Sequence, residues 1–197
     1  MKNILSIDGW YFRVFSKLAN LILLNLIFVV SILPIVTTGI SIIALINSLQ
    51  ELKEDGSLSA LKVFTAHFKN NLTKGLVLLV IEVAGFSIPG VLIFLSLKHV
   101  PLLSTLIMIL FSFLLLLLVV FPFVYALNNY SVKEAFFQTV AFVTVKIAYA
   151  IAIFIIPIAI IFFSLKYQII FLFLIGISLI FYIQLYFINK AGVLSES

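Results

Sequence analysis

The sequence predicts an all-α polytopic membrane protein with six transmembrane helices arranged as three hairpins, and with short amphipathic helices on the cytoplasmic side. Of its 197 residues, 64% are hydrophobic and 10% are charged, whereas soluble domains average about 45–50% and about 25%. Its long apolar runs are near or above the ~20 residues that cross a ~30 Å hydrocarbon core. No hydrophilic stretch is long enough for a soluble domain, so residues 1–197 are expected to form one membrane domain.

The first span is expected to follow an aromatic girdle at the membrane surface. Trp10, Tyr11 and Phe12 lie close to Arg13 and Lys17, a mixture typical of the interface between lipid and water. No small-x-small cleavage site follows the apolar run, so this segment is expected to stay as a helix rather than to be removed as a signal peptide.

Residues 18–50 carry no charge and are too long for one span, because a single helix of that length would measure about 50 Å. Pro34 cannot donate a hydrogen bond and is expected to end the first helix. Thr37 or Thr38 can cap the second helix, and Gly39 allows close backbone packing. The segment therefore predicts an extracellular hairpin apex, with a Pro-kinked single helix as the alternative.

The distribution of positive charge favours this hairpin. With a break at Pro34, ten of the twelve basic residues share one side and only Lys98 and Lys166 face away, whereas five spans would divide them five to seven. By the positive-inside rule we expect a multi-pass membrane protein with both termini in the cytoplasm. The remaining spans are expected at residues 75–97, 101–125, 146–164 and 168–188.

Both inner loops predict short amphipathic helices. In the first, Asp55-Gly56 forms a turn, Ser57 is an N-cap candidate, and the apolar residues recur at helical spacing: these are Leu58, Leu61, Phe64, Phe68 and Leu72. In the second, Ser131 and Glu134 match a capping box that precedes Phe136.

Two roles are open for these inner helices. They can lie on anionic lipid at the membrane surface, or they can dock another subunit through Phe64, Phe68 and Phe136. His67 is interpreted as a solvated residue rather than a metal ligand, because no second histidine or carboxylate lies four residues away.

Candidates for chemistry are few. The sequence has no cysteine, paired histidines, Walker loop or Gly-x-Ser-x-Gly motif, so we expect no enzyme, metal site, cofactor or nucleic-acid partner. Glu82 is the one ionisable residue well inside a span. It is expected to hydrogen-bond another helix, through Asn25 or Asn47, or else to bind protons or substrate.

The last span carries a polar stripe at helical spacing: Ser178, Tyr182, Tyr186 and Asn189. Together with Glu82, the first three are weak candidates for sugar contacts. Hydrogen bonds between helices explain the stripe equally well.

A hairpin motif is followed by three residues of the first inner loop: Asn25, Leu33, Pro34, Thr37, Gly39, Ala44 and Leu45, then Phe64, Phe68 and Asn71. Through these positions, residues 15–85 resemble the YesL-like integral membrane proteins of bacteria, a family of unknown function, which implies a location in the bacterial cell membrane. Phe28 and Ile40 depart from the motif, since such proteins often carry tryptophan and proline there.

This resemblance implies a genomic association with carbohydrate uptake, often by ABC importers, and it brings no catalytic residues. We therefore expect an accessory membrane subunit that contacts the transmembrane subunits of a carbohydrate (oligosaccharide) importer and the lipid bilayer. The alternative is a self-contained substrate binder, such as the substrate component of an energy-coupling-factor transporter. That type usually shows an Ala-x-x-x-Ala pattern in its first helix, which is not found around Ala19.

Overall fold

A computed structural model describes residues 10–54, 59–97 and 101–192, and within them it contains helices and no strand. The elements are α1 (Trp10–Ser31), η1 (Ile35–Thr37), α2 (Thr38–Glu54), α3 (Ala60–Asn70), α4 (Leu72–Leu97), α5 (Pro101–Leu127), α6 (Val132–Val145), α7 (Ile147–Tyr167), α8 (Ile169–Phe171), η2 (Leu172–Gly176) and α9 (Ile177–Lys190).

Six helical segments of the described chain are long and apolar enough to cross a membrane, which confirms the expected number. Pro89, Pro122 and Pro157 lie inside α4, α5 and α7 without ending them. Membrane helices tolerate such prolines because neighbouring groups satisfy the freed carbonyls. The chain is interrupted instead at Pro34 and at Gln168, and both residues have extended backbone angles.

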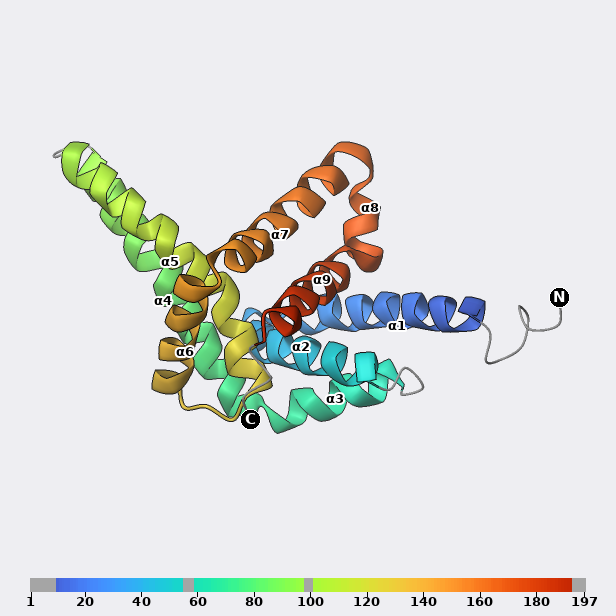
Figure 1. Cartoon of the computed structure of the whole chain (residues 1–197). Coiled ribbons are helices and arrows are strands. Elements are labelled where there is room, and N and C mark those ends of the chain that lie inside the picture. The colour runs from blue at the N-terminus through green and yellow to red at the C-terminus, as the bar shows by residue number, and fades with distance from the viewer. Residues whose placement is uncertain (1–9, 55–58, 98–100, 193–197) are drawn as a thin grey trace.

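The helix pairs diverge from a shared centre (Figure 1). In that view α4 and α5 rise together to the upper left, α7 and α9 open to the upper right, and α1, α2 and α3 extend to the right. Helix α2 occupies the centre, where it packs against α3, α4, α5 and α9. It is the most buried of the six, with 56% of its segment inside the protein.

The apex of the first hairpin lies at the beginning of α4. A Cβ atom added to Gly39 would collide with the carbonyl oxygen of Gly75 and would stand 2.8 Å from the backbone nitrogen of Leu79. Two facing glycines therefore bring α2 and α4 into backbone contact, which confirms the close packing expected at Gly39. Lys74 also donates to the carbonyl of Asn128, at 2.9 Å, so the end of α5 belongs to the same end of the molecule.

This position differs from the expected one, in which Pro34 shares a side with Lys98 and Lys166. Helix α4 has 26 residues and is about 39 Å long at 1.5 Å per residue. Because Gly39 contacts the first turns of α4, the apex at Pro34 cannot also lie level with the last turn of α4, which precedes Lys98. The contact between Gly39 and Gly75 therefore determines where the apex lies.

Several expectations fall on residues outside the described part. These are the girdle side chains of Trp10 to Arg13, the turn at Asp55-Gly56, the cap at Ser57, the residue Leu58, and Lys98. Among the described residues, Ser59 precedes the first turn of α3 without a side-chain cap bond. Before α6, the capping box of Ser131 and Glu134 is present, as predicted.

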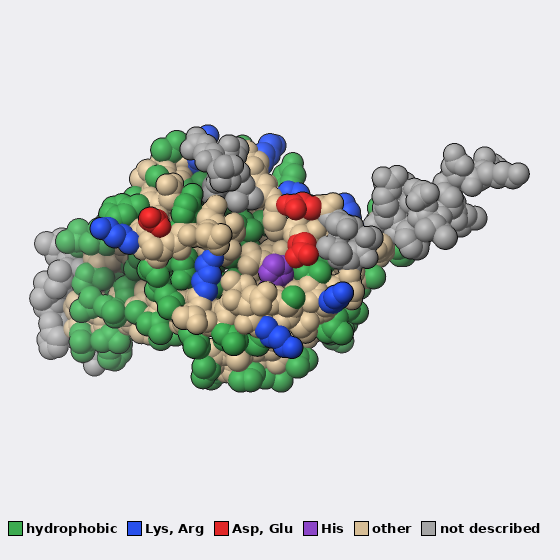
Figure 2. All heavy atoms as spheres, turned by 90° about the horizontal axis from the view of Figure 1, so that it is seen from below, with side chains coloured by type: hydrophobic (Ala, Val, Ile, Leu, Met, Phe, Trp, Pro, Cys, Tyr) green, Lys and Arg blue, Asp and Glu red, His purple; other side chains and the backbone are tan. Residues whose placement is uncertain are grey.

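Charged side chains gather on one face. Seen from below in Figure 2, this face carries basic side chains, several carboxylates and a histidine, with apolar side chains around its edges. It lies opposite the upper tips of the α4–α5 and α7–α9 pairs in Figure 1. We call it the charged face.

Candidate functional site

The hairpin apex is stabilised by Thr37. Its hydroxyl donates to the carbonyls of Ser31, at 2.5 Å, and Pro34, at 2.6 Å, and shares its one hydrogen between them. The Ser31 carbonyl loses its helical partner where α1 ends, and unpaired backbone groups are costly in lipid, whereas the Pro34 carbonyl also accepts from the backbone N–H of Thr37. Thr37 therefore serves the end of α1 and the apex, whereas we had expected it or Thr38 to cap the start of α2.

Asn25 joins the first helix to the last one. Its amide nitrogen donates to the carbonyls of Leu172, at 3.3 Å, and Phe173, at 2.6 Å, and its oxygen accepts from the backbone N–H of Ser178, at 2.8 Å. The carbonyls belong to η2, a π-helical turn whose wider spacing disturbs the regular ladder. Asn25 is fully buried, so its three bonds hold this irregular turn in place.

Helix α9 is tied to three neighbours by side-chain hydrogen bonds. The hydroxyl of Ser178 donates to the carbonyl of Leu21 in α1, at 2.7 Å. Gln184 donates to the carbonyl of Ile153 in α7, at 2.9 Å. Asn189 donates to the side-chain oxygen of Gln50 in α2, also at 2.9 Å.

The structure thus brings together two residues that the sequence analysis treated separately, Asn25 of the hairpin motif and Ser178 of the polar stripe. Their bonds go to each other's helices, which favours the interhelical interpretation of the stripe over sugar contacts. Gln184 was missed, because it lies off the stripe and its partner carbonyl is known only from the fold.

The other sugar-contact candidates lie apart from Ser178. Tyr182 lines a shallow hollow between α1, α2 and α9, together with Lys17 and Lys53. Tyr186 is half exposed and lies beneath the ammonium group of Lys190, which is 5.9 Å from its ring centroid. Tyr182 is the one candidate among the residues that line this hollow, the groove between α1 and α3, and the groove between α7 and α9.

Glu82 lies in the middle of α4, one turn after the buried Leu78 and one turn before Gly85, which contacts Leu118 of α5. Its Oε1 atom is buried and has no hydrogen-bond partner. Neither expected donor bonds to this atom: Asn25 is occupied by η2, and Asn47 does not donate to it. Glu82 therefore supplies a polar atom that the described chain leaves unsatisfied.

The predicted docking residues of the first inner helix differ in exposure. Phe64 is 2% exposed and belongs to the core, so its ring cannot reach a partner without unpacking α3. Phe68 is partly buried and stacks on Phe64 with ring centroids 6.1 Å apart. The structure assigns Phe64 to packing, because α3 folds against α1 and α2 rather than lying alone on the surface.

The second inner helix presents an exposed aromatic pair. Phe136 is 47% exposed and its neighbour Phe137 is 61% exposed, with ring centroids 6.1 Å apart. The opposite side of α6 is buried, through Ala135, Thr139, Phe142 and Val143. At its start, Glu134 accepts from the backbone N–H and the hydroxyl of Ser131, at 2.8 and 2.9 Å. These bonds lower the pKa of the Glu134 carboxyl below its usual value.

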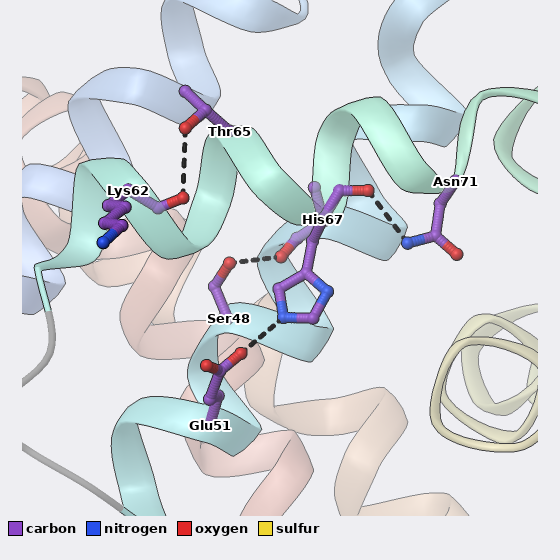
Figure 3. Close-up of polar contacts among 7 residues, drawn as sticks. Ser48, Glu51, Lys62, Thr65, His67 and Asn71 are labelled. Carbon is purple, nitrogen blue, oxygen red and sulfur yellow. Dashed lines mark hydrogen bonds and ion pairs between the residues drawn. The ribbon is translucent and has the colours of Figure 1, made fainter.

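His67 has a partner that sequence spacing did not indicate. Its Nε2 lies 2.6 Å from a carboxylate oxygen of Glu51 in α2 (Figure 3), so the two form an ion pair when the ring is protonated. The same α3 segment is closed by Asn71, whose side chain donates to the carbonyl of His67 at 2.8 Å. The pair joins α2 to α3, and the described residues contain no cluster of three metal-ligating side chains.

Comparison with known proteins identifies one similarity. Residues 21–92, which are 72 of the 197, match the family described as "Protein of unknown function, DUF624". No curated protein and no solved structure matches the chain. The matched segment contains Asn25, the apex at Pro34, the Gly39–Gly75 contact and Glu82, so the similarity falls on the first hairpin and on the helix against which it packs.

Proposed function

We propose that this protein is an accessory membrane subunit of a bacterial carbohydrate ABC importer, and that it binds the importer through the exposed aromatic pair of α6. The importer context comes from the resemblance of residues 15–85 to YesL-like proteins. The match to a family of unknown function adds no activity to it. What the geometry contributes is a surface suited to a partner.

The observation that carries the proposal is the pair Phe136 and Phe137. Both rings are exposed, yet the helix that bears them is fixed by a capping box and by a buried opposite side. Large aromatic side chains held in place are the residues that most often anchor protein interfaces. A rigid helix loses little conformational freedom when it docks, which favours binding.

The internal bonds of the polar residues support an accessory role over a self-contained substrate binder. The backbone N–H of Ser178 donates to Asn25, and its hydroxyl donates to the carbonyl of Leu21. The ring of Tyr186 lies beneath the ammonium group of Lys190. A binding pocket for a sugar needs several polar groups that converge on one cavity. The two grooves of about 480 and 500 Å³ are lined mainly by apolar side chains.

We propose that the charged face is cytoplasmic and that the C-terminus lies on that side. The expected cytoplasmic N-terminus does not follow, because α1 is long enough to cross the membrane and ends at the apex, beside Gly75. The positive-inside rule supports this orientation, because lysines concentrate on that face. The connection at Gln168 then lies outside. Since Gly39 contacts Gly75, a cysteine at Thr38 should react from the same side as one at Ser131. In intact cells both should need membrane-permeant reagents, whereas a cysteine at Gln168 should react with impermeant ones.

The partner proposal is tested by a pull-down of the tagged full-length protein from membranes in mild detergent, followed by mass spectrometry. Wild type should recover importer permease subunits, and the double substitution Phe136→Ser with Phe137→Ser should lose most of them. The matched control is Val132→Ser with Val145→Ser, which removes two other exposed apolar side chains from α6 and should keep the permease.

Two outcomes would contradict the proposal. The protein could emerge alone from gentle extraction while its deletion leaves growth on every tested oligosaccharide unchanged. Alternatively, the control pair could lose the permease as fully as the aromatic pair, which would show that recovery depends on general hydrophobicity of α6 and not on its aromatic rings.

A further inference from the structure

A groove runs between α1 and α3 on the side of the molecule. Its volume is about 480 Å³, within the range that holds small ligands. The walls are Leu26 and Val30 on α1, and Leu61 and Phe68 on α3, with Phe64 also contributing. Lys69 lines the same groove. It is therefore an apolar channel with one positive side chain.

The groove is open to whatever surrounds the helices. Val30 is 66% exposed and Leu61 is 52% exposed, although both line it. Val30 lies on α1, a candidate membrane span, and apolar side chains exposed along such a helix face lipid tails. An acyl chain can therefore enter from the side without any helix moving.

Positive charge is concentrated along one edge of the groove. Lys62 and Lys69 are both exposed and are seven residues apart on α3, so they project from nearly the same side of the helix. Among the described residues the only ion pair joins His67 to Glu51, and no described carboxylate is paired with either lysine. The ammonium group of Lys69 is thus available beside an apolar channel.

We propose that this groove binds one anionic phospholipid, with an acyl chain between α1 and α3 and the headgroup phosphate on Lys69. Basic side chains between membrane helices on the cytoplasmic side bind such headgroups. The match of an apolar channel to the tail and of an ammonium group to the phosphate identifies an acidic lipid rather than a neutral one.

A second groove shows what the lysine adds. It lies between α7, α8 and α9, has a volume of about 500 Å³, and is lined by Phe163, Tyr167 and Phe171 among others. Its size and apolar character match those of the α1–α3 groove, but the ammonium group of Lys166 lies 5.6 Å from the ring centroid of Tyr167. In Lys166→Ala this groove should accept acyl chains without regard to headgroup charge, so that variant provides an internal reference.

Native mass spectrometry of the full-length protein in detergent tests the assignment. Phosphatidylglycerol and phosphatidylcholine with identical acyl chains are titrated in parallel. Wild type should bind one phosphatidylglycerol more tightly than phosphatidylcholine. Lys69→Ala should weaken the phosphatidylglycerol complex about fivefold, the usual contribution of one lysine near an acidic surface, and should leave phosphatidylcholine unchanged. Lys133→Ala, on α6, is the charge control and should keep the preference.

Filling the groove gives an independent test. Leu61→Trp should reduce binding of both lipids at this site, whereas Leu179→Trp, in the reference groove, should leave the headgroup preference intact. Because Lys69 is exposed, its variant is expected to fold, which thermal unfolding of both proteins checks. Equal affinity of wild type for the two lipids, or a preference that survives in Lys69→Ala, would overturn the proposal. A two-copy complex that Leu61→Trp abolishes would assign the groove to a second copy of the chain.

Discussion

Helices α2 and α4 pack against each other, yet they face different surroundings. In the α2 segment 56% of the residues are buried, whereas in the α4 segment 6% are. The buried residues of α2 include Gly39, Ser41, Ala44 and Ser48. By contrast, α4 exposes large apolar side chains along most of its length, from Val80 to Leu95. The helix with the smaller and more polar side chains is the one inside.

This comparison shows what drives burial in a membrane. Lipid tails are as apolar as leucine, so apolar side chains gain little by moving from lipid into the protein. Small residues permit close backbone approach, and hydroxyl groups can bond to the helix itself, as Ser48 does to the carbonyl of Ala44 at 2.6 Å. Six isoleucines and leucines of α2 are buried as well, so burial at the centre of this molecule depends on size and hydrogen bonding in addition to apolar packing.

The largest expected effect comes from adding one methyl group to the glycine contact. Gly39→Ala places a Cβ against the backbone of Gly75 and Leu79, and backbone atoms cannot rotate away. We expect the free energy of unfolding to fall by about 1–3 kcal/mol, the usual cost of overpacking. This loss should be measured as a lower unfolding temperature in detergent. Gly90→Ala on α4 is the matched control, since its added Cβ meets nothing within 4 Å. Equal stability of the two variants would contradict the claim that small residues bury α2 by allowing backbone contact with α4.

The next effect tests whether polar bonds hold the interior. Asn25→Leu removes the hydrogen-bond partner of the Leu172 and Phe173 carbonyls and of the Ser178 N–H. It should lower the free energy of unfolding by about 1–3 kcal/mol, because these buried backbone groups are left unpaired. Ser112→Ala is the control, because that hydroxyl bonds only to the carbonyl of Met108 in its own helix. Thermal unfolding in detergent measures both. If Asn25→Leu is as stable as Ser112→Ala, the clamp on η2 contributes nothing.

Glu82 carries a buried polar atom on α4, a helix that otherwise exposes mainly apolar side chains. Its substitution tests whether a polar group without a partner stabilises a helix that faces lipid. Because its Oε1 has no partner, Glu82→Leu should leave the stability of the isolated protein unchanged or should raise it slightly. Glu82→Gln should be no more stable than Glu82→Leu, since its amide keeps a polar group in the same place. A clear loss of stability in Glu82→Leu alone would reveal an internal partner that the helix packing does not show.

The smallest effect lies outside both helices, at the start of α6. The pKa of Glu134 is lowered in the folded protein, so its stabilising contribution is present above the unfolded pKa of about 4.3. That contribution is lost as the pH falls through the folded pKa. The carboxylate accepts from the backbone N–H of Ser131, so hydrogen exchange of the Ser131 amide should rise, relative to amides within α6, only in acid. Glu134→Gln keeps the acceptor without the titration, and its relative exchange should not change in that range.

Local patterns allowed the elements to be predicted, and tertiary contacts decided the rest. Spans and the capping box at Ser131 follow from apolar length and from residues three apart, and both were found. The burial of Phe64, the pairing of His67 with Glu51 and the position of the Pro34 apex depend on how α3 and α4 return along α2. No spacing within one helix carries that information.

The clamp at Asn25 also has a consequence for synthesis. Its partners Leu172 and Phe173 are 147 and 148 residues further along the chain, so at ~5–20 residues per second they emerge roughly 7–30 s later. During that interval the side-chain amide of Asn25 has no native hydrogen-bond acceptor, and lipid tails cannot supply one. Nascent chains that stop before Leu172 should therefore stay beside the insertion machinery or be degraded, while the complete chain is released.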